Sequence, residues 1–119
     1  MQRHICIIAP IIEEVIFRGP LQDKLKSAFK LIYLNRGFSD SDANTAARVT
    51  AVFFTSITFG LIHFSNAIMF WCNPVLFLPQ VVAATLMGLV FGIAKEFSGE
   101  LYMPFGMHIG NNTVAWAQI

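Results

Sequence analysis

Charged residues are scarce in this chain, and this limits the environments in which it can fold. Asp, Glu, Lys and Arg make up 13% of the 119 residues. A soluble domain usually carries about 25% of charged residues. Hydrophobic residues make up 55% of the chain, which favours a nonaqueous environment for much of it. The length allows one domain at most.

Other absences exclude further classes of protein. The formal net charge is +1 and no basic stripe is present, so we exclude a nucleic-acid partner. Cys6 and Cys72 form no metal-binding or redox motif. The sequence also contains no internal repeat and no low-complexity tract.

Long uncharged stretches dominate what is present. Residues 49–70 and 74–94 contain no charged side chain, and each is about 20 residues long, enough to cross a bilayer as a helix. A third uncharged stretch covers 101–119, and a further apolar segment starts at 5–12. Because lipid does not tolerate unpaired backbone groups, the sequence predicts an all-α, polytopic membrane bundle of about four helices around a polar intramembrane cavity.

Turn signals divide these predicted helices. The polar segment 37–42 supplies N-cap residues for a helix that starts near Ala43. Asn73-Pro74 separates the second helix from the third, and Ser98-Gly99 ends the third.

The basic residues predict an orientation in the membrane. They lie mainly in segments 19–48 and 95–100, whereas the 66–73 turn carries no charge. The positive-inside rule places basic loops in the cytoplasm. We therefore expect an integral, multi-pass membrane protein with cytoplasmic loops at 19–48 and 95–100.

Two adjacent glutamates interrupt the first apolar segment. Glu14 and Arg18 are four residues apart, so they share a helix face and can pair. Glu13 lies about 100° around the helix and is left to act as a general base. Charged residues inside a membrane helix are costly and rare without a role. The alternative is that all three lie at the interface and are solvated.

Two histidines follow, each within an uncharged stretch. His63 lies one helical turn after Phe59, which could line a substrate pocket, although both residues could equally be core. His108 and Asn112 are four apart on one helix face, and both can donate hydrogen bonds to a developing oxyanion. Their alternative role is polar contact between helices, which is common in membranes.

Together these residues supply a base and oxyanion donors, which are the groups that peptide hydrolysis needs. The three motifs read Glu13-Glu14-x-x-x-Arg18, Phe59-x-x-x-His63 and His108-x-x-x-Asn112. In this order they resemble the pattern of the type II CAAX prenyl endopeptidases and their bacterial relatives, the CPBP (Abi, or CAAX protease-like) intramembrane peptidases. Members usually have more helices than four, so we expect residues 1–119 to be a single catalytic core, as a fragment or shortened form.

The resemblance implies a role for each of these residues. Glu13 and His63 would hold and activate the water, His108 and Asn112 would form the oxyanion hole, and Glu14 and Arg18 would support the first helix. The implied substrate is a peptide or protein at the bilayer, such as a prenylated tail or a bacteriocin.

No cofactor is required by this mechanism. Many relatives are described as metalloproteases, but the sequence contains no His-Glu-x-x-His motif. A divalent metal such as zinc, held by a glutamate and two histidines, is the alternative. Two other functions stay open: a noncatalytic membrane immunity or scaffold protein, and a transporter with a buried glutamate–histidine relay.

Overall fold

The computed structural model describes residues 2–69, 71 and 73–117, and they are almost entirely helical. The elements are α1 (Gln2–Ile16), a π-helical turn (Phe17–Leu21), α2 (Gln22–Asn35), α3 (Asp40–Ile62), α4 (Ser65–Met69), a 3-10 turn (Pro74–Phe77), α5 (Leu78–Ser98) and α6 (Tyr102–Ala117). No strand occurs in this part of the chain. The prediction of an all-α membrane bundle is confirmed.

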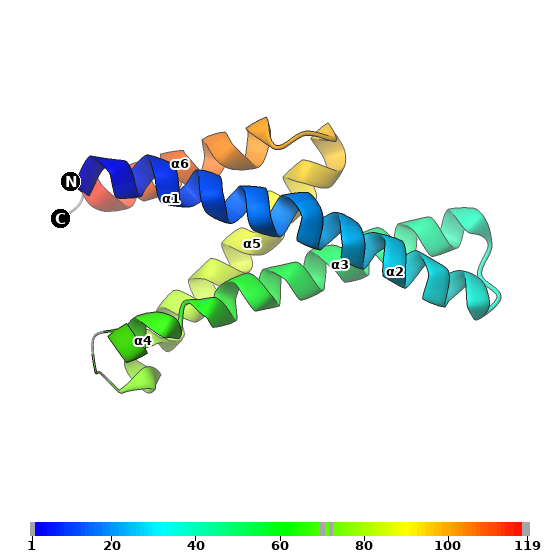
Figure 1. Ribbon diagram of the computed structural model, residues 1–119, viewed down its shortest axis with the longest axis horizontal. Coiled ribbons are helices and arrows are strands. Elements are labelled where there is room, and N and C mark those ends of the chain that lie inside the picture. Colours follow the sequence, from blue (N-terminus) through cyan, green and yellow to red (C-terminus); the bar gives the residue numbers. More distant parts are fainter. Residues whose placement is uncertain (1, 70, 72, 118–119) are drawn as a thin grey trace.

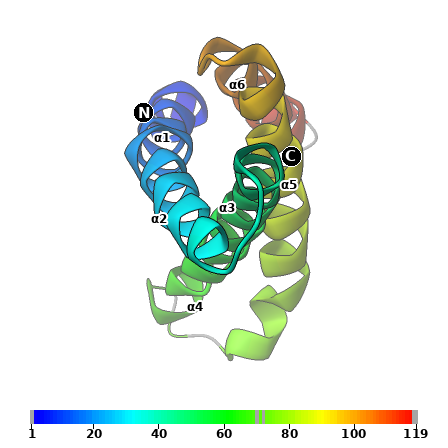
Figure 2. The same cartoon turned by 90° about the vertical axis from the view of Figure 1, so that its right-hand side faces the viewer.

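The helices form a flat, elongated assembly. α1, the π-helical turn and α2 make one bent rod along the long dimension, and α6 lies beside α1 (Figure 1). α3 packs against both α2 and α5, and Figure 2 shows these helices from the end of the molecule. The extents are 51 × 31 × 18 Å. With helices about 10 Å wide, the shortest dimension corresponds to two layers.

Within the described residues, two helical segments are long and apolar enough to cross a membrane. They are Asp40–Met69, which contains an 18-residue window of mean hydropathy 1.5, and Pro74–Ser98, which contains one of mean hydropathy 2.0. Large apolar side chains are exposed on the outer faces of both, including Phe53, Leu61, Val82 and Leu86. Such a surface is satisfied by lipid rather than by water.

The basic segments predicted as loops are helical instead, and this part of the prediction was wrong. α2 and the first turns of α3 occupy most of 19–48, and α5 continues to Ser98 through most of 95–100. The lysines were read as loop residues, but Lys is a good helix former. Charge alone therefore does not mark a loop. The connections are short, at 36–39 and 99–101.

The helix ends follow the predicted signals with small shifts. Ser39 is the N-cap of α3, and its hydroxyl accepts a hydrogen bond of 3.1 Å from the Asp42 amide. α3 therefore starts at Asp40, three residues before the predicted Ala43. Gly99 ends α5 in the left-handed conformation, with φ of 73°, which glycine adopts without strain. The predicted ends of the second and fourth spans, Phe70 and Ile119, lie outside the described residues.

α3 and α5 approach each other closely because small residues line their contact. A β-carbon at Gly60 on α3 would lie 2.8 Å from the Val81 backbone oxygen on α5. One at Gly88 on α5 would lie 3.1 Å from the Ser56 α-carbon. Small residues at helix contacts are a general means of close packing in membranes.

A cluster of ion pairs ties α2 to the start of α3 and the end of α5. Lys95 is largely buried and pairs with Asp23, while Lys26 and Arg48 lie 3.3 and 3.6 Å from the Glu96 carboxylate. Burial by itself would raise the pKa of the Asp23 carboxyl, but the hydrogen bond and charge of Lys95, together with Lys26, lower that pKa below its ordinary value.

Replacing Gly60 by alanine tests the close contact. The added methyl group would overlap the Val81 backbone, which cannot rotate away, so we expect Gly60→Ala to lower the free energy of unfolding by about 1–3 kcal/mol. Gly106→Ala on α6 is the matched control, because no atom lies within 4 Å of its added β-carbon. Scanning fluorimetry in one detergent compares the two. Equal melting temperatures would contradict the packing described here.

Candidate active site

A local break in the first rod positions the acidic motif. Pro20 has no backbone N–H and its ring clashes with the carbonyl four residues earlier, so a regular helix cannot continue through it. The chain responds with the π-helical turn, in which Gly19 has nonhelical torsions of φ −79° and ψ −110°. Arg18 lies within this turn and is fully buried.

Glu14 and Arg18 form a fully buried charge pair, as their spacing predicted. The Arg18 Nε atom lies 3.3 Å from the Glu14 Oε2 atom, and both side chains have no exposed surface. Arg18 Nη1 also donates a 3.2 Å hydrogen bond to the Thr55 hydroxyl on α3. Its guanidinium lies 5.4 Å from the centre of the Phe59 ring, a cation–π distance. The pair therefore joins the first rod to α3.

Glu14 also reaches the second histidine. Its Oε1 atom lies 3.0 Å from His108 Nδ1 on α6, and His108 Nε2 lies 3.6 Å from Glu13 Oε2. A carboxylate accepts hydrogen bonds, so Nδ1 of His108 carries the proton in this contact. His108 is thus held between the two adjacent glutamates, one on each ring nitrogen.

His63 is fixed by the end of its own helix. It is the C-cap residue of α3, and its Nδ1 atom lies 2.8 Å from the Phe59 backbone oxygen. The last carbonyls of a helix lack partners within the helix, and a carbonyl only accepts. Nδ1 is therefore the donor, which leaves Nε2 of the neutral ring as a hydrogen-bond acceptor.

Glu13 and His63 line one cavity of about 210 Å³. The Glu13 side chain is 38% exposed, in contrast to the buried Glu14. Phe59 and Phe17 form apolar walls, with their ring centroids 5.3 Å apart in an edge-to-face arrangement. Polar groups that converge beside aromatic side chains are typical of binding sites.

Asn66 and Gln80 complete the cavity, and neither was singled out from the sequence. They come from α4 and from the first turns of α5, and Asn66 donates a 3.1 Å hydrogen bond from its amide to Gln80 Oε1. Gln80 and Thr85 are the polar residues of the otherwise apolar stretch 74–94, and the amide of Gln80 was an available signal. Asn66 gave no such signal because it lay in a predicted turn.

The aromatic rings also hold both histidines. The centre of the Phe59 ring lies 5.1 Å from that of His63 and 5.7 Å from that of His108. Phe91 on α5 stacks on His108 at 5.0 Å. Phe59, predicted as a possible pocket wall, thus lies between the two imidazoles and lines the cavity.

Asn112 is the predicted site residue that this arrangement does not bring in. Its Oδ1 atom lies 3.4 Å from Asn111 Nδ2, and it is not among the residues that line the cavity with Glu13 and His63. It lies one helical turn beyond His108 on α6. Of the predicted residues, Glu13, Phe59 and His63 line the cavity. Glu14, Arg18 and His108 are not among its lining residues and are linked to it through contacts with one another, with Glu13 and with Phe59. Asn112 belongs to neither group.

A buried polar line extends from the site along the first rod. Glu14, Arg18 and Gln22 follow at intervals of four and are all fully buried. Gln22 Nε2 donates a 2.9 Å hydrogen bond to Glu96. Glu14 Oε2, Arg18 Nε and Nη2, and Gln22 Oε1 are the buried side-chain atoms without a hydrogen-bond partner in the described part of the chain. Arg18 and Glu14 are thus joined by charge more than by a directed hydrogen bond.

The residues present do not fit a zinc site of three protein ligands. Within residues 2–69, 71 and 73–117, no group of three His, Cys, Asp or Glu side chains is placed to hold a metal ion. Structural and catalytic zinc sites need at least three converging ligands.

Removing Glu14 tests the buried charge pair. Glu14→Ala leaves Arg18 as an uncompensated buried charge, which typically costs about 3–5 kcal/mol. The exposed Glu100→Ala is the matched control and should unfold like the unsubstituted protein. Glu14→Ala combined with Arg18→Met should recover part of the loss, because the unpaired cation is gone. A melting temperature of Glu14→Ala equal to that of Glu100→Ala would show that the pair is not formed.

The three motifs all lie within a region that matches a known protein family. Residues 4–114 match the family described as type II CAAX prenyl endopeptidase Rce1-like. No curated protein and no solved structure matches the chain. The family match covers most of the chain and includes every residue predicted for the site. The chain therefore belongs to the type II CAAX prenyl endopeptidase Rce1-like family of integral membrane proteases.

Proposed function

We propose that this protein hydrolyses a peptide bond at or within the membrane, with water activated by Glu13 and His63. The observation that carries the proposal is that these two side chains line the same cavity. The cavity volume of about 210 Å³ far exceeds the 10–15 Å³ or so that one water needs. Family membership supports a CAAX-type endopeptidase, and the residue roles are our proposal.

The chemistry follows from the two acceptors. Nε2 of His63 accepts one hydrogen bond from the water and orients it, while the Glu13 carboxylate takes the other proton. The water oxygen then bonds to the peptide carbonyl carbon. Glu13 delivers the proton to the amide nitrogen as the carbon–nitrogen bond breaks, which balances the reaction. General-base catalysis of this kind contributes about 10²–10⁴-fold.

His108 is the candidate oxyanion donor, and its surroundings determine the protonation state that this role requires. Because Nδ1 already donates to Glu14, a neutral ring has no hydrogen on Nε2. Donation to an oxyanion therefore requires the doubly protonated ring. In that form each nitrogen has a carboxylate nearby, at 3.0 and 3.6 Å. Asn112, one turn further along α6, would join as a second donor only if its side chain turned toward the cavity.

Glu14 and Arg18 act in this proposal as positioning residues. Glu14 orients His108 through Nδ1, and Arg18 holds Glu14 in place while it contacts Thr55 and Phe59. This division leaves Glu13, the more exposed glutamate, for the proton transfer. Catalytic groups commonly depend on such a supporting set of contacts.

The substrate class is a peptide or protein presented at the bilayer. Asn66 and Gln80 border the cavity and offer amide donors and acceptors to a peptide backbone. We propose a multi-pass arrangement in which the basic end, at α2 and the neighbouring ends of α3 and α5, faces the cytoplasm. A lipidated tail and an unlipidated peptide are both compatible with this arrangement.

Substitution of the two water-binding residues tests the mechanism. We expect Glu13→Gln and His63→Ala to lower turnover by about 10²–10⁴-fold while leaving the fold intact. Glu13→Gln keeps the shape of the side chain and removes only the base. The measurement is cleavage of a panel of lipidated and unlipidated peptides by purified protein in detergent, with Glu100→Gln as the control.

Two results would reject this assignment. Full cleavage by Glu13→Gln would exclude Glu13 as the base. Proton movement across vesicle membranes that needs Glu13, without cleavage of any peptide, would favour a relay over a peptidase.

Chelation separates the proposed mechanism from metal catalysis. Because the described residues do not assemble three metal ligands, we expect peptide cleavage to survive a strong chelator. Metal analysis of the active protein should give substoichiometric zinc. Loss of activity on chelation, its return with zinc and one tightly bound zinc per chain would establish a metalloenzyme instead.

A further inference from the structure

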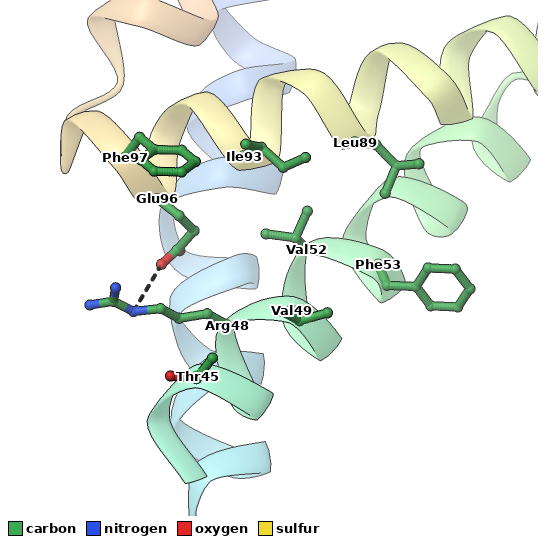
Figure 3. A pocket seen from close by; sticks show the side chains of 9 residues that line it. All are labelled: Thr45, Arg48, Val49, Val52, Phe53, Leu89, Ile93, Glu96 and Phe97. Carbon is green, nitrogen blue, oxygen red and sulfur yellow. Dashed lines mark ion pairs between the residues drawn. The ribbon is translucent and has the colours of Figure 1, made fainter. Parts of the chain in front are cut away.

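An apolar groove lies on the outer side of the bundle, away from the site described above. It runs between α3 and α5 and has a volume of about 380 Å³. Its apolar lining consists of Val49, Val52 and Phe53 on α3, and Leu89, Ile93 and Phe97 on α5. Figure 3 shows the two helices with these side chains along the groove. These are the helices of the two segments long enough to span a membrane.

One end of the groove is polar. Arg48, Thr45 and Glu96 line it there, with Arg48 Nε 3.6 Å from Glu96 Oε2 (Figure 3). The Arg48 side chain is about half exposed, at 51%. A guanidinium carries five N–H donors in a planar fork that matches phosphate. The single contact with Glu96 leaves most of that fork facing outward.

A second, polar cavity of about 280 Å³ adjoins the groove at this end. The two share Arg48 and Glu96. The charged side chains that line the second cavity are Lys26, Arg48, Lys95, Asp23 and Glu96. Three cations face two anions, so one positive charge is left over. The combined space is therefore amphipathic, with an apolar arm and a cationic head.

The dimensions match a lipid in one leaflet. From Thr45 to Phe53, and from Leu89 to Phe97, the lining extends over about 12 Å at 1.5 Å per residue. One leaflet of a bilayer has a hydrocarbon thickness of about 15 Å, half of the usual 30 Å. An acyl chain that starts at the polar end would therefore run along the groove through most of its leaflet.

We propose that the groove and the adjoining cavity bind one phospholipid of net negative charge, with an acyl chain between α3 and α5 and its headgroup phosphate on Arg48. The uncompensated positive charge selects an anionic headgroup over a zwitterionic one. The apolar groove provides affinity for the chain regardless of headgroup. The site is separate from the Glu13–His63 cavity and does not depend on the proposed peptidase activity.

Native mass spectrometry of the purified protein tests the proposal. The probes are phosphatidylglycerol and phosphatidylcholine with identical acyl chains, added to protein in a neutral detergent. We expect phosphatidylglycerol to be retained about fivefold more strongly than phosphatidylcholine. This is the preference for anionic lipid that one basic residue near a membrane surface provides. Arg48→Gln should bring this ratio close to one, whereas the exposed Arg36→Gln should not change it.

A second pair of variants tests the apolar arm. Ile93→Trp fills the groove and should reduce retention of both lipids, whereas Val90→Trp, on the same helix but outside the groove lining, should not. Because Ile93 and Val90 are both about half exposed, neither change disturbs the core, and circular dichroism verifies the fold.

Three results would overturn the proposal. The first is equal retention of the two lipids by the unsubstituted protein. The second is displacement of phosphatidylglycerol by millimolar inorganic phosphate, which would indicate an anion site without a chain. The third is a dimer that Ile93→Trp disrupts, which would assign the groove to a second copy of the chain.

Discussion

The buried pair of Glu14 and Arg18 is the interaction on which the rest of this structure depends. Each charge, taken alone, costs about 2.5–3.5 kcal/mol to place in the middle of a membrane helix. Both are fully buried here, so removal of either one leaves the other as an unpaired buried charge. Several weak contacts offset the cost of burying the two charges. They are the contacts with Thr55, the Phe59 ring and His108. Those partners belong to α3 and α6, so three separate segments are aligned by one pair of charges.

Because of this alignment, the two neighbouring glutamates have different surroundings. The helix turns by about 100° per residue, so Glu13 and Glu14 cannot face the same surroundings. Glu14 pairs with Arg18 and is fully buried, whereas Glu13 lines the cavity together with His63. His108 lies between the two carboxylates. The adjacent position of two acidic residues thus provides one structural group and one available group from a single turn.

The helical, membrane-embedded fold and the Glu14–Arg18 pairing could be predicted from the sequence, because they depend on composition and on helical spacing. The polar segment that caps α3 and the α5 end at Gly99 were predicted for the same reason, since each depends on a few adjacent residues, although α3 starts at Asp40 rather than near Ala43. The break at Gly19-Pro20 was not predicted. The pair was an available signal, but the way a helix accommodates a proline depends on what packs against it. Asn66 and Gln80 entered the cavity only through tertiary contacts, and the helical state of the basic segment was missed because charge was read as a loop signal. Asn112 was predicted as a site residue because it lies four residues after His108. That spacing places both residues on one helix face, but it does not determine which way the Asn112 side chain points.

The His63 ring combines two tasks in one contact. Its Nδ1–H group satisfies the Phe59 carbonyl at the end of α3, so the bond that closes the helix also selects the tautomer. Protonation of the ring would fill Nε2 and remove the lone pair that accepts a hydrogen bond from water in the proposed mechanism, yet the bond to Phe59 would persist because Nδ1 is a donor in both forms. The doubly protonated ring would therefore accept no hydrogen bond, while the end of α3 stays closed. Fraying of the last turn of α3 would instead release Nδ1 from the Phe59 carbonyl, so the ring could exchange tautomers.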